Sequence, residues 1–202
     1  MTSVITGDII NSRKLSPTVW IDELKNLLNT VGTSPIQWEI YRGDEFQLEV
    51  KPEDALITAI EIKALLRTLK LDVRMSIGFG DKTYQAAQIS ESNGTAFIRS
   101  GAMFENLKKQ KTNLAVNSGD ASFDIEMNLM LRLALSIMDH WLVQSAEYVL
   151  TAIRNQKLSQ EELGQKLGIN QAAVSRRRKR AYFDLIADLE AHYREKIKTI
   201  ST

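Results

Sequence analysis

Apolar residues near the N-terminus follow strand spacing and helix spacing in turn. Residues 3–10 form an apolar, β-branched run that predicts a buried strand, and residues 19–31 place apolar side chains on one helical face. Two short strands are predicted at 36–42 and 46–50, because a polar, glycine-containing turn separates two runs of strand-forming residues. This part of the chain is therefore predicted to be a strand, a helix and a hairpin.

The pattern continues with a further helix, strand, helix and strand. The helix is predicted from Pro52 to Leu69, because proline favours the first helical turn and apolar residues follow at helical spacing. The next three elements are predicted at 72–80, 95–110 and 113–117. The complete order, β-α-β-β-α-β-α-β, predicts an α+β fold with helices packed on one face of the sheet.

The C-terminal part is predicted to be helical throughout. Residues 125–155 are strongly apolar and contain no proline, which predicts one long helix, buried within the chain or at a homodimer interface. From Tyr182 onward, apolar residues recur every three or four positions and predict an amphipathic helix that could hold a dimer. We expect an α+β domain at 1–120, a connecting helix at 121–155 and a small helical domain at 156–202.

Composition restricts the chemistry of the chain. Its 202 residues include no cysteine and two histidines, His140 and His192, which excludes disulfides, thiolate zinc sites and histidine-rich metal sites. Any metal must therefore be bound by carboxylates. No run approaches the ~20 apolar residues of a membrane span, and the N-terminus lacks the pattern of a signal peptide, so we expect a cytoplasmic protein without a membrane partner.

Charge is distributed unevenly along the chain. Residues 156–202 hold ten Lys and Arg against six Asp and Glu, a net charge of +4, whereas residues 1–155 hold 16 against 19, a net charge of −3. A local excess of basic residues is typical of a surface that binds the phosphate backbone of nucleic acid. The sequence therefore predicts that any DNA contact lies in the C-terminal part.

Three acidic residues form the main candidate site of the N-terminal part. Asp8 ends the apolar run VITGD, and Asp44 and Glu45 lie at the tip of the predicted hairpin in YRGDEFQLEV. If these strands are neighbours in one sheet, the carboxylates meet at one edge and offer the oxygen ligands that Mg²⁺ or Mn²⁺ prefers. The alternative is a purely local role, because Gly-Asp is common in turns and aspartate often caps the segment after a strand.

The segments TGDIINS, YRGDEFQ and RMSIGFG together resemble the core of palm-type nucleotidyl cyclases, the class that includes the class III cyclases and the GGDEF diguanylate cyclases. The resemblance covers roughly residues 1–118 and implies a ferredoxin-like palm sheet with helices. It also implies that Asp8 and Asp44 bind two divalent ions, which neutralise a nucleoside triphosphate and activate its 3′-hydroxyl. Glu45, beside Asp44, completes the implied catalytic carboxylates.

The same resemblance implies a phosphate-binding segment directly after the first strand. The backbone from Ile9 through Asn11 to Ser12 would lie along the phosphate oxygens. The Ser12 hydroxyl and the side chains of Arg13 and Lys14 would add hydrogen-bond donors. A nucleotide is therefore the implied ligand of this segment.

Gly43 and Arg99 complete the residues that the resemblance implies. Gly43 forms the hairpin turn beside the nucleotide, and Arg99, on the helix after the fourth strand, would contact a phosphate or the transition state. The sequence departs from the GGDEF pattern, because Arg42 replaces its first glycine and no inhibitory RxxD motif precedes the hairpin. The nucleobase and the product therefore stay open.

The segment SQEELGQKLGINQAAVSRRRKR resembles a helix-turn-helix. Ser159 and Glu162 have the spacing of a capping box, Gly168 permits a sharp turn, and Asn170 can cap a second helix. The side chains predicted to face the bases are Gln171, Ala172, Ser175 and Arg176, and those predicted to contact phosphates are Arg177, Lys179 and Arg180.

Two residues of this second helix have the chemistry to read bases in the major groove. Gln171 matches adenine and Arg176 matches guanine. Arg177 falls near a position that is usually apolar in such motifs, which predicts that the second helix is rotated or that the arginine stem lies across the edge of the core. The alternative for the whole segment is a pair of helices that only pack, with the basic run as a solvated face.

The combination of TGDIINSRKL, YRGDEFQ and a C-terminal helix-turn-helix resembles the SatD family over nearly the whole chain. That resemblance implies an architecture rather than a defined reaction. Three functions fit the sequence: a DNA-binding regulator with a nucleotide- and metal-binding sensory part, an active nucleotidyl cyclase or nucleotidyltransferase, and a non-catalytic interaction module.

Overall fold

A single mixed sheet forms the centre of the N-terminal part. The computed structural model describes residues 1–41 and 43–200, so Arg42 of the hairpin lies outside the described residues. The five strands are β1 (Thr2–Ile10), β2 (Trp38–Tyr41), β3 (Glu45–Val50), β4 (Asp72–Gly80) and β5 (Leu114–Asn117). Their order is β2-β3-β1-β4-β5, with β1 antiparallel to both of its neighbours and β5 parallel to β4.

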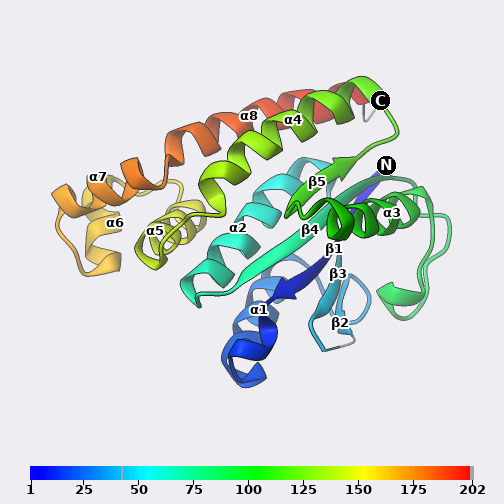
Figure 1. The fold of residues 1–202 in the computed structure, drawn as a ribbon, viewed down its shortest axis with the longest axis horizontal. Helices are drawn as coiled ribbons and strands as arrows, with labels where there is room; N and C mark the ends of the chain where they lie inside the picture. Colours follow the sequence, from blue (N-terminus) through cyan, green and yellow to red (C-terminus); the bar gives the residue numbers. More distant parts are fainter. Residues whose placement is uncertain (42, 201–202) are drawn as a thin grey trace.

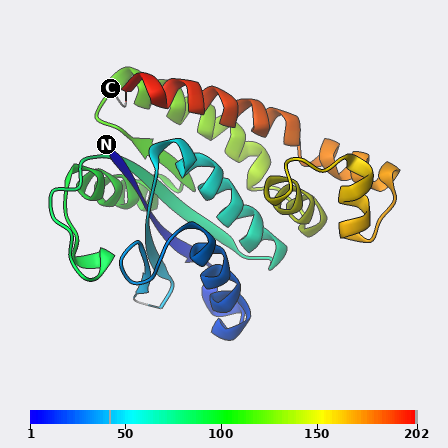
Figure 2. The same cartoon turned by 180° about the vertical axis from the view of Figure 1, so that it is seen from behind.

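Helices surround this sheet and extend beyond one end of it. They are α1 (Pro17–Val31), α2 (Ala55–Thr68), α3 (Thr95–Gln110), α4 (Ala121–Met138), α5 (Val143–Arg154), α6 (Gln160–Leu167), α7 (Gln171–Arg180) and α8 (Phe183–Ile200). Figure 1 and Figure 2 show α4 and α8 side by side along the sheet, and α5, α6 and α7 gathered at one end. The α+β class predicted from the sequence is confirmed.

Side-chain alternation along the strands gives the sheet two different faces. On one face, Ile5, Ile9, Phe46 and Ile77 are buried in the large hydrophobic core, to which α1 and α2 contribute their apolar residues. The opposite face is more polar. It carries the side chains of Thr6 and the charged residues that alternate with the core positions.

The prediction that helices pack on one face is wrong, because α3 covers part of the polar face. Ser76 of β4 donates a hydrogen bond to the carbonyl oxygen of Ser100 at 2.7 Å, and the hydroxyls of Thr6 and Ser100 are also in contact. A Cβ at Gly78 would lie only 2.3 Å from the carbonyl oxygen of Ala96. Gly78 is therefore what lets α3 approach the sheet so closely.

The predicted long helix at 125–155 is interrupted, and two helices, α4 and α5, replace it. Lys63 of α2 forms ion pairs with Asp139 at 2.6 Å and with Asp72 of β4 at 2.7 Å, although its side chain is fully buried. The Trp141 carbonyl accepts two hydrogen bonds from Arg67. These fixed polar contacts hold the chain in a turn where the apolar pattern alone predicted continuation.

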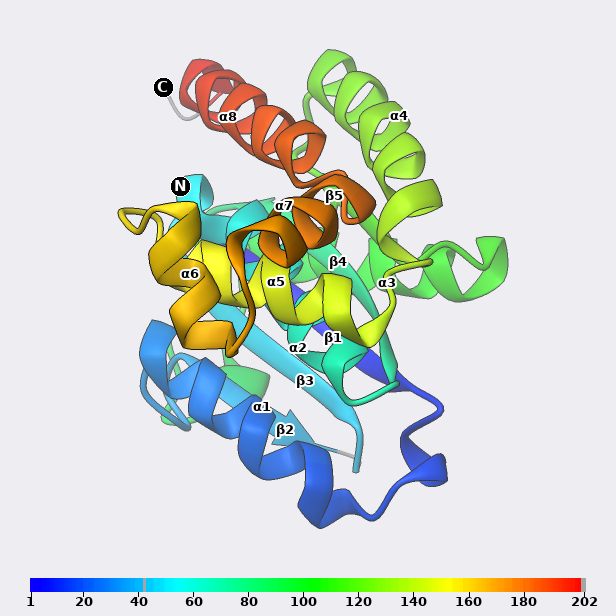
Figure 3. The ribbon, with the colours of Figure 1, turned by 90° about the vertical axis from the view of Figure 1, so that its left-hand side faces the viewer.

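The ends of α6 and α7 follow their predicted capping signals. Ser159 and Glu162 form the capping box of α6, and the Asn170 side chain accepts a hydrogen bond from the Ala173 N–H at the start of α7. Gly168 has a φ of 64°, a left-handed conformation that glycine adopts without steric cost. Figure 3 faces this end of the molecule and shows α5, α6 and α7 packed together.

The C-terminal helix α8 returns to the sheet. The rings of Phe79, Phe123 and Tyr193 are mutual neighbours, with centroids 6.1–6.5 Å apart, and the Tyr193 hydroxyl donates to the Pro52 carbonyl. One hydrophobic core is continuous from β1 through α4 and α5 to α8. None of the described helices is both long enough and apolar enough to cross a membrane.

The buried ion pairs of Lys63 give a first prediction. Lys63→Met removes the buried cation that bridges Asp72 and Asp139, and leaves Asp72 with Arg67 at 3.6 Å as its remaining ion-pair partner. We expect the free energy of unfolding, measured in urea, to fall by about 3–5 kcal/mol. Lys25→Met, at an exposed position of α1, is the control and should change it by less than about 0.5 kcal/mol. A loss at Lys63 no larger than at Lys25 would contradict this role.

Candidate functional site

One row of charged side chains crosses the polar face of the sheet. The strand register pairs Asp8 of β1 with Glu45 of β3 on one side and with Arg74 of β4 on the other. Asp44 precedes Glu45, and its carbonyl accepts a hydrogen bond from the Ile9 N–H at 3.1 Å. The structure therefore brings the three predicted carboxylates to one end of the central strands.

Asp8 is the most unusual residue of this row. Its Oδ1 atom is buried without a hydrogen-bond partner among the described residues, and its Oδ2 atom lies 3.7 Å from Arg74 Nη1, beyond hydrogen-bond distance. Burial raises the pKa of Asp8, the charges of Arg74 and Lys108 oppose the shift, and those of Asp44 and Glu45 add to it. Asp8 is thus a carboxylate whose charge the protein leaves only partly compensated.

Lysine and arginine side chains complete the cluster, and the sequence reasoning missed both. Lys108 of α3 lies 3.2 Å from Glu45 and 3.2 Å from Glu105. Partial burial lowers the pKa of Lys108, but hydrogen bonds to Glu105 and Glu45 outweigh this and raise it. Arg74 could have been found from the sequence, because the alternation in DVRMSIGFG places its side chain on the sheet face opposite to that of the apolar Val73. Lys108 had none, because its position depends on how α3 packs.

The segment after β1 matches only part of the predicted phosphate cradle. Ser12 donates to Asp44 Oδ2 at 2.6 Å, and Asn11 has a φ of 64° that turns the chain toward the site. Arg13 and Lys14 are exposed. The N–H of Ile9 is already bonded to Asp44, and the Ile9 side chain is buried in the core, so Ile9 is not available to a phosphate.

Two other predicted residues have different positions relative to the row. Gly43 is exposed in the hairpin turn with a φ of 91°, close in sequence to Asp44. Arg99 donates to the Phe79 carbonyl at 2.7 Å, near the opposite end of β4. Phe79 is five residues from Arg74, which corresponds to about 16 Å along a strand. The structure therefore does not bring Arg99 to the carboxylates, because its helix begins at the far end of the sheet.

The carboxylates are not arranged as a complete metal site. Among residues 1–41 and 43–200, no group of three or more His, Cys, Asp or Glu side chains could hold a metal ion. Glu45 is bonded to Lys108 and Asp44 to Ser12. Asp8 alone has a buried oxygen with no hydrogen-bond partner within this cluster.

Of the seven residues predicted to contact DNA, six are exposed and one, Arg177, forms an ion pair within the protein. Six of them are exposed and lie on one side of α7: Gln171, Ala172, Ser175, Arg176, Lys179 and Arg180. Arg177 is different, because its side chain is only 19% exposed and lies 2.8 Å from Glu147 of α5. The sequence assigned Arg177 to phosphates, but the structure uses it to attach α7 to α5.

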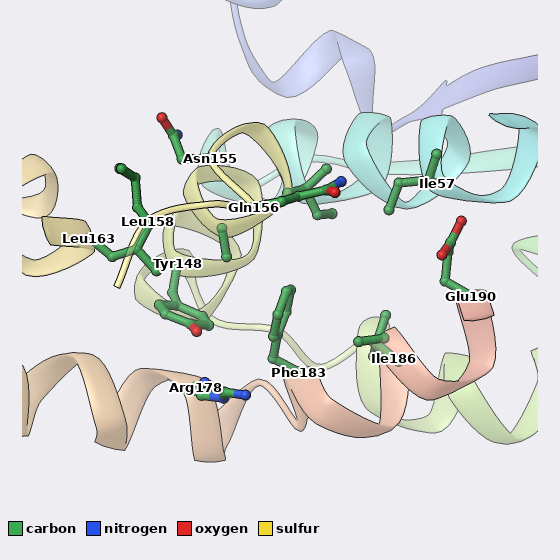
Figure 4. A pocket seen from close by; sticks show the side chains of 13 residues that line it. Ile57, Tyr148, Asn155, Gln156, Leu158, Leu163, Arg178, Phe183, Ile186 and Glu190 are labelled. Carbon is green, nitrogen blue, oxygen red and sulfur yellow. The ribbon is translucent and has the colours of Figure 1, made fainter. Parts of the chain in front are cut away.

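A separate cavity of about 330 Å³ lies between α2, α5 and α8 (Figure 4). Its walls include the edge-to-face rings of Tyr148 and Phe183. The two charged residues that line it, Arg178 and Glu190, are bonded to Asp184 and to Arg194. Among the described residues, none of those predicted to carry function lines this cavity.

Comparison with known protein families gives a match to this chain. The sequence model of the SatD family matches residues 3–190, a span that includes both the charged row and α7. The chain belongs to the SatD family. No curated protein and no solved structure gives a match. The SatD family match therefore establishes what the chain is related to, while its chemistry has to be argued from the site.

The raised pKa of Asp8 predicts that its ionisation destabilises this SatD family protein, whereas ionisation of an aspartate usually stabilises the folded state. This raised pKa means that the folded state binds the proton more tightly than the unfolded state. Stability should therefore fall as the pH rises from 3.8, the ordinary pKa, through the raised value, and stay reduced above it. Asp8→Asn should raise the melting temperature at pH 7, with the gain disappearing below about pH 4.

Thermal unfolding measured by circular dichroism from pH 3 to pH 8 tests this. Asp22→Asn, at an exposed position of α1, is the matched control and should leave the melting temperature close to that of the unmodified protein throughout. If Asp8→Asn is less stable than the unmodified protein at pH 7, Arg74 and Lys108 fully compensate the charge of Asp8.

Proposed function

We propose that this protein is a cytoplasmic DNA-binding transcriptional regulator whose sheet-containing part binds a nucleotide together with Mg²⁺ or Mn²⁺. The exposed face of α7 carries this proposal most directly. It presents a glutamine, two small side chains and three cations along one side of a short helix whose other side carries the buried Val174 and partly buried residues. Such a helix has the composition and length of one that enters the major groove.

The connection between α6 and α7 supports a helix-turn-helix. A Cβ at Gly164 of α6 would lie 2.7 Å from the Ile169 carbonyl of the turn and 3.3 Å from Val174 Cγ2 of α7, so glycine lets the turn and α7 pack closely on α6. Val174 of α7 is fully buried beneath the exposed face. In this proposal Gln171 and Arg176 contact bases, Lys179 and Arg180 contact phosphates, and Arg177 holds α7 at its angle through Glu147.

The sheet order supports a palm-like fold for the N-terminal part. Strands β2-β3-β1-β4 have the order and antiparallel directions of a ferredoxin-like βαββαβ unit, with β5 added beside β4. The charged row lies on the sheet face opposite to α1 and α2. A ligand there would meet carboxylates from the central strands and cations from β4 and α3.

A metal–nucleotide complex fits this row better than a metal alone. Mg²⁺ is usually held by one or two carboxylates, with phosphate oxygens and waters completing six ligands. Asp8 and Asp44 would hold the ion, and a phosphate would bring the acceptors that Arg74 and Lys108 can bind. This requirement is consistent with the lack of a complete metal-binding group among the described residues.

A chain of buried contacts supports communication between the two parts. Asp72, two residues before Arg74 on β4, pairs with Lys63, which pairs with Asp139 at the end of α4. Two residues later, the Trp141 indole donates to the Ala181 carbonyl at 3.0 Å, between α7 and α8. A shift of β4 on nucleotide binding would therefore reach the base of the DNA-reading helix through fixed contacts.

The second candidate is an active nucleotidyl cyclase or nucleotidyltransferase. The observation that favours it is the Oδ1 atom of Asp8, a buried carboxylate oxygen that has no hydrogen-bond partner among the described residues and lies beside two further acids. Two-metal chemistry needs such oxygens to hold the ion that activates the attacking hydroxyl. Arg99 takes no part in this version, because it lies at the other end of β4.

DNA binding is tested at Arg176. Arg176→Ala should weaken binding to duplex DNA selected by the unmodified protein from a random pool by about 10- to 100-fold, and should lower the dependence of affinity on salt. The measurement is fluorescence anisotropy at several salt concentrations. Lys109→Ala, at an exposed position of α3, is the control and should leave the affinity unchanged. Equal affinity for Arg176→Ala would remove α7 as the DNA-reading helix.

The nucleotide site is tested by incubating the protein with each nucleoside triphosphate and Mg²⁺ or Mn²⁺. Calorimetry should detect metal-dependent binding of one nucleotide, and Asp44→Asn should weaken it at least about tenfold because a metal ligand is lost. Asp81→Asn, an exposed aspartate after β4, is the control. Chromatography then separates the functions: a product absent with Asp44→Asn indicates an enzyme, and binding without a product indicates a sensor. Absence of both binding and product would contradict a nucleotide site.

A further inference from the structure

An exposed apolar stripe runs along the outer side of α4 and into the groove between α4 and α8. Ile125, Leu129 and Leu133 recur every four residues on α4, with side chains 73%, 50% and 64% exposed, and Leu185 of α8 is 56% exposed. A groove between the helices, lined by Met130, Ile137 and Leu189 among others, continues this surface. We call the surface formed by these seven residues the α4–α8 face.

We infer that the α4–α8 face is the interface of a homodimer, in which the two-fold axis runs parallel to the helices. Each helix of 18 residues is about 27 Å long, and two adjacent helices are about 20 Å wide. The outer side of the pair, which contains the α4–α8 face, therefore offers about 500 Å² per copy, or about 1,000 Å² in a dimer, which reaches the lower limit of a specific interface. Isolated exposed leucines need no partner, but a continuous stripe of this kind does.

The heights of charged residues along the two helices select the direction of the axis. Glu126 of α4 contacts both His192 and Lys196 of α8 at 2.8 Å, which places it level with about residue 194. The helices run in opposite directions (Figure 1). Arg132 lies six residues after Glu126 on α4, and Asp188 lies six residues before position 194 on α8, so Arg132 and Asp188 are level with one another. Neither has an ion-pair partner among the described residues.

A two-fold axis parallel to the helices keeps every height and exchanges α4 with α8. Arg132 of one copy then lies opposite Asp188 of the second copy, and Leu133 enters the groove beside Leu185. An axis perpendicular to the helices would instead place α4 on α4 and would separate these charges. Both axes leave neighbouring helices antiparallel, as in a four-helix bundle, so the charged pair and not the helix directions selects the parallel axis.

This arrangement places both DNA-reading helices at the same end of the dimer. In each copy, α7 lies beyond the end of the α4–α8 pair (Figure 1), and the parallel axis leaves that end unchanged. Two α7 helices would then face one DNA duplex, which suits a palindromic site. The binding of two α7 helices to one DNA duplex rests on the proposed function, whereas the homodimer itself does not.

Light scattering after size-exclusion chromatography tests the interface. The unmodified protein should have twice the chain mass of 22.8 kDa, and Leu133→Asp should have the mass of one chain, because it places a charge in the apolar face. Ile98→Asp, at a 62% exposed position of α3, is the matched control and should stay dimeric. Circular dichroism confirms that each variant is folded.

The charged pair tests the direction of the axis. Arg132→Asp should shift the protein toward monomer, and combining it with Asp188→Arg should restore the dimer. A monomeric unmodified protein at 50 μM, or a dimer that persists with Leu133→Asp, would overturn the interface. Failure of the double variant to restore the dimer would overturn the parallel axis. A dimer that follows these expectations but binds no DNA would contradict the proposed function and leave the interface standing.

Discussion

The buried amine of Lys63 is the constraint on which the arrangement of the two parts depends. A fully buried lysine is stable only if carboxylates compensate its charge, and here Asp72 comes from β4 while Asp139 comes from the end of α4. This pairing ends α4 at a fixed place relative to the sheet. The turn that follows buries Trp141, whose indole bonds the chain between α7 and α8. The position of α7 thus follows from one ion cluster and the buried turn that it fixes.

Burial along α8 makes the helical part an extension of the sheet's own core. The Tyr193 ring lies against Phe79 of β4 and Phe123 of α4, so apolar contacts and the Lys63 ion pairs connect the same elements at different points. Such a double connection resists rotation about either one. The α4 and α8 helices form one layer whose inner side is buried and whose outer side carries the α4–α8 face, for which we propose a second copy as the cover.

Sequence patterns predicted most elements, because local spacing determines them. Alternation revealed the strands, and the caps at Ser159 and Asn170 revealed where α6 and α7 begin. The interruption after α4 could not be predicted, since residues 125–155 are apolar throughout and the turn is imposed by Lys63 from a distant helix. The same limit applies to the site. Asp8, Asp44 and Glu45 follow from strand pairing, whereas Lys108 depends on α3 covering the polar face, and Arg99 was misplaced for the same reason.

A nucleotide can change DNA affinity only if it binds one arrangement of the protein more tightly than another. In the proposed site this condition rests on the different origins of its residues: Asp8 belongs to β1, Asp44 and Glu45 to the start of β3, Arg74 to β4 and Lys108 to α3. Arg74 lies 3.7 Å from Asp8, and its Nε atom is also buried without a hydrogen-bond partner among the described residues. In the proposed site, a bound phosphate would accept hydrogen bonds from Arg74 and its cation would bind Asp8, which would draw β1 and β4 toward the ligand. Because β4 also carries Asp72, such a movement would act on Lys63 directly, and the cost of leaving a buried charge unpaired would make α4 follow.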